Sequence, residues 1–237
     1  VFIRPEVTTH TSIAQQSAEF DTLQSGTLVV TDNQVTKKTF GGFVQISEQD
    51  LDWTDPAILS IVLDDLGRVY AQQTDNEAAD ALVAGATVTE NFTVASINDP
   101  TEWARWFYAA AQGILSTSNG NLPNHVFVSP NIWAALGELT DSSDRPLFPQ
   151  VGPMNAFGSM GPGTTEAVAF GLRVVVDRNF ANDTLIAGDA SGFEIYEQLK
   201  GAISVDVPET LSRTLAWRGY FATLMIDNQK FRKAVFV

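Results

Sequence analysis

The sequence predicts an α+β fold organised around one long helix. Apolar residues recur every three or four positions from residue 58 to residue 82, which is the period of a helix with one buried face. The segment KKTFGGFVQIS, just before it, alternates like a strand. Thr-, Val- and aromatic-rich segments return in the last third of the chain. A long helix together with scattered strands indicates an α+β fold rather than an all-α or all-β one.

The long helix is expected from about residue 55 to residue 84. Asp55 followed by Pro56 places an N-cap oxygen before a residue that suits the first helical position. Gly85 is expected to stop the helix in a left-handed conformation. At about 1.5 Å per residue, this helix would be on the order of 40 Å long. Taken alone, it is equally well read as a long core helix. Its apolar stripe consists of Ile58, Leu59, Val62, Leu66, Val69 and Tyr70.

Residues 1–36 predict an arm rather than a packed layer. They are rich in Thr, Gln and Ser, and they alternate weakly at residues 27–30 and again from Val35, with the polar residues 31–34 between. Disorder is the alternative, but large apolar residues are spread too regularly for a plain linker. We therefore expect a two-stranded arm. Because an isolated hairpin is marginally stable in water, such an arm needs a neighbour to lie on.

The remaining elements follow from caps and alternation. Ser47 and the acids after it predict a short helix through residues 51–53, and Asp99-Pro100 and Ser129-Pro130 repeat the cap-then-proline start of a helix. Residues 141–165 are rich in Gly and Pro and predict a long loop. The periodicity of residues 213–227 does not decide between helix and strand, although Thr, Tyr, Phe and Ile favour strand. Strands are expected at 40–46, 125–128, 172–176, 184–187, 193–196, 202–207 and 231–237. Those at 172–176, 184–187 and 193–196 are expected to form one small sheet, with Gly171 and Gly188 at turns.

Composition limits the function classes. The 237 residues include no Cys and two His, which excludes a disulfide framework and makes a transition-metal site improbable. The net charge of -14 would repel nucleic acid phosphates. No apolar run of about 18 residues is present, so no membrane span is expected. The chain begins at Val1, from which we expect upstream residues to have been cleaved, deleted or left out.

The candidate chemical groups favour structural roles, and we predict no enzyme, no cofactor, and no catalytic, cofactor-binding or metal-binding residue. Adjacent carboxylates on a helix diverge, and acids near a helix start are favoured there in any case. Lys230, Arg232 and Lys233 are read as a solvated strand face or an inter-subunit salt bridge, with nucleic acid contact as the weaker reading. Gly158–Gly163 lacks the Lys of a phosphate loop. The other candidate groups are Asp64 with Asp65, Glu48 with Asp50 and Asp52, Glu194 with Glu197, His10 and His125.

The order of these motifs resembles the major capsid protein family of tailed double-stranded DNA bacteriophages. Three stretches carry the resemblance: a strand, a Ser and an acidic turn at residues 43–51; HVFVSPNIWAAL with its strand, Ser-Pro and Trp helix; and FGLRVVVDRNF followed by TLIAGDASGFEIYE. The resemblance covers nearly the whole chain.

This resemblance implies a fold with a spine helix and three parts. The arm, an extended β-hairpin loop, would be residues 1–38. A peripheral domain would hold residues 39–99 and 208–237, and an axial domain residues 100–207. The irregular loop at 141–165 would point to the centre of pentamers and hexamers. Some members of the family join subunits through a lysine of the extended loop, but residues 1–36 contain no Lys, so non-covalent shell stability is expected.

The implied function is that of a structural subunit. It would assemble with itself into pentamers and hexamers of an icosahedral shell that encloses phage double-stranded DNA without sequence-specific binding. Scaffolding, portal and decoration proteins are the other implied partners. The implied location is the virion capsid, after assembly in the cytoplasm of the host bacterium. Alternatives are an encapsulin-like nanocompartment shell, a decoration or adhesion module and, remotely, a carboxylate-dependent hydrolase.

Overall fold

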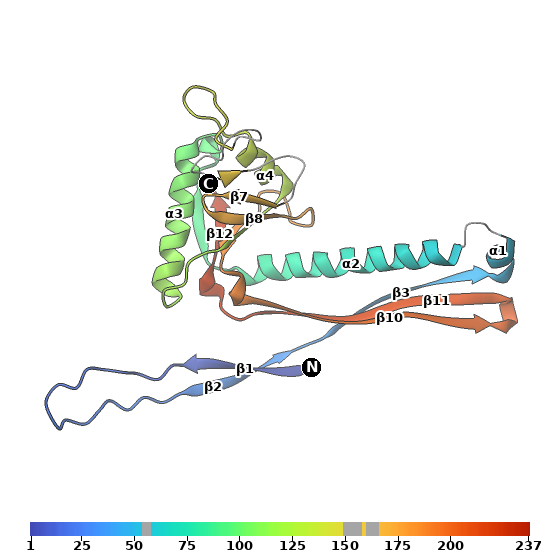
Figure 1. Cartoon of the computed structure of the whole chain (residues 1–237), viewed down its shortest axis with the longest axis horizontal. Coiled ribbons are helices and arrows are strands. Elements are labelled where there is room, and N and C mark those ends of the chain that lie inside the picture. Colours follow the sequence, from blue (N-terminus) through green and yellow to red (C-terminus); the bar gives the residue numbers. More distant parts are fainter. Residues whose placement is uncertain (54–57, 149–157, 160–165) are drawn as a thin grey trace.

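The computed structural model describes residues 1–53, 58–148, 158–159 and 166–237. The molecule is elongated and mixes helices with strands, which confirms the α+β expectation (Figure 1). A limb built from one helix and a β-ribbon extends from a head, which lies at one end of this limb. A hairpin arm projects in the other direction, beyond the body of the chain. The shape is therefore that of a flat, branched subunit.

The head contains a seven-stranded mixed sheet. Its strand order is β4-β12-β9-β5-β8-β7-β6, so the C-terminal strand lies next to strands from the middle of the chain. Helices α3 (Pro100–Thr117) and α4 (Pro130–Gly137) contribute to its core, where Trp103 and Trp106 are fully buried. The strands are β4 (Thr89–Phe92), β5 (His125–Val128), β6 (Gly158–Ser159), β7 (Glu166–Ala169), β8 (Leu172–Val176), β9 (Leu185–Gly188) and β12 (Phe231–Phe236).

The limb pairs the long helix with a three-stranded antiparallel ribbon. Helix α2 (Ile58–Gly85) runs along the sheet β10-β11-β3, formed by β10 (Phe193–Val207), β11 (Ser212–Met225) and β3 (Lys38–Ser47) (Figure 1). The short helix α1 (Glu48–Trp53) ends the limb, and the Asp50 amide donates to Ser47 Oγ at 3.1 Å, as the sequence predicts.

The arm is a separate two-stranded sheet. Strands β1 (Phe2–Thr9) and β2 (Val29–Val35) pair antiparallel, which confirms the hairpin. Residues 31–34, expected to separate two strands, lie within β2, because their backbone pairs with residues 3–6 of β1. Strand pairing outweighs the weak strand propensity of these polar residues.

The long helix is confirmed from Ile58 onward, but its apolar stripe is less buried than expected. Tyr70 is buried, whereas Ile58 and Leu66 are only partly covered and Val69 is 42% exposed. The helix meets the head only at its C-terminal end, and a single narrow ribbon covers the rest. The predicted cap at Asp55 and Pro56 lies outside the described residues.

Two glycines have a different role from the predicted one. Gly85 is the last residue of α2 and does not adopt a left-handed conformation; a Cβ there would lie 2.6 Å from Met225 Cε. Gly188 is the last residue of β9, where it pairs with both Phe231 and His125, and a Cβ would lie 2.2 Å from the Phe231 ring. Both glycines permit close packing. Gly171 does sit at a turn, with φ +77°.

Two further expectations need correction. Residues 193–196 and 202–207 form one strand, β10, which pairs with β11 and not with β8 or β9. Ser129 precedes α4 without a side-chain cap bond, since its hydroxyl donates to Asn131 instead. Most of the predicted loop at 141–165 lies outside the described residues. The Asp99 cap of α3 is confirmed by its bond from the Thr101 amide at 2.9 Å.

We predict that Gly219→Ala separates the ribbon from α2. A Cβ at Gly219 would lie 2.1 Å from the buried Tyr70 hydroxyl, so the substitution should lower the free energy of unfolding by about 1–3 kcal/mol in urea denaturation. Gly42→Ala is the matched control, because its Cβ would meet Leu66 Cδ2 at an ordinary 3.7 Å. Equal effects of the two substitutions would contradict this packing.

We also predict that a tie between β4 and α3, formed by the hydrogen bonds that Glu102 accepts, is lost in acid. Glu102 accepts from Arg105 Nε at 2.8 Å and from the Thr93 amide at 2.9 Å, and these bonds, the Arg105 bond first, lower its pKa to about 2. A lowered pKa stabilises the fold above the ordinary value of 4.5, and this contribution is lost as the pH falls toward 2.

Glu102→Gln should therefore cost about 1 kcal/mol near neutral pH, and less as the pH approaches 2, in urea unfolding series at several pH values. Asp65→Asn, in the exposed pair with Arg68, is the control, with an expected change below about 0.5 kcal/mol. A Glu102→Gln cost that stays constant down to pH of about 2 would refute the tie.

Candidate functional site

The arm exposes the apolar side chains that a folded strand normally hides. In β1 the side chains of Phe2, Arg4 and Glu6 are partly covered, whereas Ile3 and Val7 on the other face are exposed. Between the strands, Ile13 and Phe20 are 96% and 95% exposed. The outward face of the arm is therefore its apolar one. Leu23, Leu28, Val29 and Val30 are exposed as well.

A second apolar surface lies on the face of the ribbon that points away from α2. Trp217 contacts α2 at Gly67, so the neighbouring Ala216 points to the opposite face of the sheet. The register places Phe43 and Ile203 on either side of Ala216. Phe43 is 73% exposed. This face and the arm leave two apolar surfaces that the chain itself does not bury.

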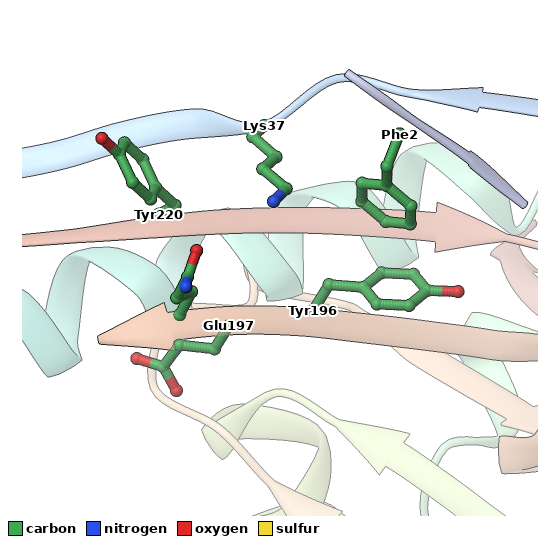
Figure 2. Close-up of a pocket in the computed structure, with 6 residues that line it drawn as sticks. Phe2, Lys37, Tyr196, Glu197 and Tyr220 are labelled. Carbon is green, nitrogen blue, oxygen red and sulfur yellow. The ribbon is translucent and has the colours of Figure 1, made fainter. Parts of the chain in front are cut away.

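A pocket of about 430 Å³ lies where the arm meets the ribbon (Figure 2). The Phe2 ring faces the Tyr196 ring edge-on, with centroids 4.7 Å apart, and Lys37 Nζ lies 5.5 Å from the Phe2 centroid. Tyr220 and Glu197 complete the wall with Gln198. The pocket joins β1, β10 and β11, whose sequence separation left no pattern that could have predicted it.

Beside this pocket, Arg4 and Glu194 form a two-bond ion pair. Arg4 Nη2 and Nε donate to the two Glu194 oxygens at 2.7 and 3.1 Å, and the Tyr196 hydroxyl also donates to Glu194. These bonds, that from Arg4 first, lower the pKa of Glu194, and the bond to Glu194 raises the pKa of Tyr196. Glu194 is thus held as a carboxylate, contrary to what a general acid requires.

The other paired acids give the hydrolase reading no support. Asp65 pairs with Arg68 at 2.7 Å on the exposed face of α2. Glu194 and Glu197 are three residues apart on β10, so their side chains point to opposite faces of the ribbon. His10 is exposed in the arm, and His125 Nδ1 lies 2.6 Å from Asn124 Oδ1. The acids of α1 lie along its exposed surface and the helix start.

The described residues hold neither a metal-binding cluster nor a membrane-spanning helix. Over residues 1–53, 58–148, 158–159 and 166–237, no three His, Asp or Glu side chains gather as a metal site. Among the helices of those same residues, none combines the length and apolarity needed to cross a bilayer. Of the glycine-rich segment 158–163, only β6 lies within the described residues.

The basic cluster is not a free surface, which corrects its predicted reading. Arg232 is 4% exposed and donates to Gly113 O and Thr117 Oγ1 at 2.8 Å, near the C-terminal end of α3. Lys233 Nζ lies 3.4 Å from Val83 O near the end of α2, and Lys230 Nζ lies 3.6 Å from the Asp189 carboxylate. Desolvation lowers the pKa of Arg232. Arg232 and Lys233 therefore link β12 to the C-terminal ends of α3 and α2, where positive charge is favoured.

Comparison with known proteins identifies the same architecture elsewhere. A family model described as phage capsid protein matches residues 31–234. A solved structure from Gordonia phage Cozz has a TM-score of 0.72 at 17% identity, over 99% of this chain and 81% of that one. One from Mycobacterium phage Bobi has a TM-score of 0.69 at 13% identity, over 100% and 85%.

A further solved structure, described as the capsid of a native GTA particle, has a TM-score of 0.68 at 10% identity and covers 100% of this chain and 84% of that one. No curated protein matches the chain by sequence. At these identities the structural matches establish the fold, and the family model establishes the family.

We predict that Arg232 is required for the stability of the head. Arg232→Met would leave the Gly113 carbonyl and Thr117 hydroxyl without this donor in a buried site, and should cost about 2–4 kcal/mol of unfolding free energy in urea denaturation. Arg232→Lys retains the charge but not the planar fork, so it should recover only part of the loss.

Arg68→Met is the control for this prediction, since its ion pair with Asp65 is exposed and should be worth less than about 0.5 kcal/mol. The prediction that Arg232 stabilises the head is wrong if Arg232→Met unfolds at the same urea concentration as the control.

Proposed function

This chain belongs to the phage capsid protein family and is a structural capsid subunit, and we propose that it assembles with copies of itself into the pentamers and hexamers of an icosahedral shell. The shell would enclose phage double-stranded DNA, and the virion capsid would be its final location. The single observation that supports this assembly best is the arm, whose apolar side chains point away from its own body.

The arm is costly for an isolated chain. Exposed apolar surface contributes roughly 25 cal/mol per Å² once it is removed from water. Two strands without a third layer are marginal by themselves, and residues 10–28 of the arm are not paired as strands. Lying on a neighbouring copy would bury Ile13 and Phe20 together. Association is therefore the state in which this segment is best satisfied.

The geometry favours a closed, repeated arrangement. The arm and the exposed ribbon face are different surfaces of the same chain, so a contact between them is heterologous. When two copies form one such contact, one copy keeps a free arm and the other keeps a free ribbon face. Rings are the closed form of such contacts. Pentamers and hexamers are rings, and this makes the arm contact compatible with a shell built from both.

The charge of the chain suits a container for DNA. A net charge of -14 opposes binding of the phosphate backbone, so packaged DNA would be held by enclosure and not by contact with this chain. Scaffolding, portal and decoration proteins remain proposed partners, and assembly in the host bacterial cytoplasm remains a proposed step. The division into residues 1–38, the peripheral parts and residues 100–207 is likewise a proposal.

The domain proposal has one consequence for the strands. Strand β10 lies in the axial range but pairs with β11 and β3, and β12 lies in the peripheral range but joins the head sheet. The borders drawn along the sequence therefore pass through shared sheets, and we expect the two domains to move as one connected body.

We predict that the apolar tip of the arm is needed for assembly and not for folding. The double variant Ile13→Ser with Phe20→Ser removes side chains that are almost fully exposed in the single chain. The free energy of unfolding of the subunit, measured by thermal denaturation, should therefore change by less than about 0.5 kcal/mol. The fraction of chains in particles, measured by sedimentation velocity and electron microscopy, should fall at least about tenfold.

The matched control is Gln15→Ser with Gln24→Ser, which alters two polar, exposed positions of the same segment. It should assemble like the unmodified chain. The proposed function would be contradicted by an unmodified chain that stays monomeric at every protein and salt concentration. Equal assembly of both double variants would remove the arm tip from the interface.

A further inference from the structure

We propose that Arg4, Glu194 and Tyr196 form an arm clamp, a set of side-chain contacts that fixes the direction in which the arm leaves the body and thereby sets how copies of the chain meet. The inference rests on the proposed function, because a fixed direction matters when the arm must reach a neighbour. It goes further by assigning the orientation of the arm to named positioning residues.

Within the described residues, the arm is attached to the body at two points of different kinds. One is covalent: β2 ends at the buried Val35 and continues through Thr36 and Lys37 into β3. In the described part of the chain, the backbone of β1 pairs only with β2 and takes no place in the ribbon sheet. Without a second attachment, the hairpin could pivot about residues 36 and 37.

Side chains of β1 supply the second attachment. Both guanidinium–carboxylate bonds of the Arg4–Glu194 pair are within hydrogen-bond distance, at 2.7 and 3.1 Å, and the two side chains are only 30% and 32% exposed. A planar two-bond pair resists rotation, whereas a single contact between point charges does not. Arg4 is also the only Lys or Arg among the first 36 residues.

Aromatic packing adds a second restraint. The Phe2 and Tyr196 rings meet at 71°, and Lys37 Nζ lies over the Phe2 ring (Figure 2). Tyr196 also donates to Glu194, so the ring that holds Phe2 and the carboxylate that holds Arg4 are bonded to each other. Lys37, one of the two residues about which the hairpin could pivot, therefore also contacts β1 through Phe2.

The length of the arm makes a small contact at its base consequential. Strand β1 has 8 residues, or roughly 26 Å at about 3.3 Å per residue. A rotation of about 10° at its base would move the far end of the strands by about 5 Å, and the tip further. A shift of this size is enough to misplace a side chain in an interface pocket.

A charge swap tests the clamp. The variants are Arg4→Glu, Glu194→Arg and the double variant carrying both. Because the chain has no Cys, spin labels at Gln24→Cys and Gln112→Cys report the distance from the exposed arm to the exposed surface of α3. This distance distribution is measured on subunits kept below the concentration at which particles form, and particle yield is measured above it.

We expect each single reversal to broaden the arm-to-head distance distribution at least about twofold and to lower the particle yield at least about fivefold, and the double variant to restore both. Arg213→Glu is the matched control for the distribution, since it breaks the exposed Asp206 pair on the same ribbon without touching the arm. It should leave the distribution unchanged.

The two proposals fail in different ways. A narrow distribution in the unmodified chain, with no particles at any concentration, would refute the proposed function and leave the clamp standing. An unchanged distribution in the single reversals, or a double variant that stays as broad as either of them, would overturn the clamp. Normal particles from Arg4→Glu would also overturn it, by showing that the arm finds its neighbour without the pair.

Discussion

The dominant constraint on this molecule is that it has more apolar surface than a single chain of this shape can bury. The head buries an aromatic core that includes Trp103 and Trp106. The limb is one helix on one narrow ribbon, and the arm is a two-stranded hairpin that contacts the ribbon near its base. Apolar residues that would form a core in a compact protein, such as Phe43 and Ile13, therefore face outward. The fully buried tryptophans lie in the head, and the contacts that we propose between copies lie on the limb and arm.

The joints between these parts are made by specific contacts. Lys233 of the C-terminal strand donates to the Val83 carbonyl near the end of α2, so this strand connects the head to the limb. Arg232 of the same strand joins it to α3 within the head. Gly219 lets the ribbon approach Tyr70 of α2. At the other joint, the arm meets the ribbon through the Arg4–Glu194 pair. Each joint is small compared with the elements it connects, which makes subunit shape sensitive to single residues.

Local signals in the sequence were sufficient for most elements and insufficient for their partners. The period of the long helix, the Asp99-Pro100 start and the Ser47 cap are local, and the structure confirms them. The pairing of β10 with β11, the burial of Arg232 and the contact between Arg4 and Glu194 depend on residues that the fold brings together from far along the chain, 190 positions apart in the last case. Gly188 was misread because a glycine at a turn and one beneath an aromatic ring look alike in sequence.

The most direct test of the central claim is an electron cryomicroscopy map of particles formed by the purified chain. We expect closed shells in which the segment around Ile13 and Phe20 lies against the ribbon of an adjacent copy, with both side chains removed from solvent. A map in which the first 36 residues fold back over their own subunit, or stand free in solvent between copies, would contradict the view that the arm is completed only by a neighbour.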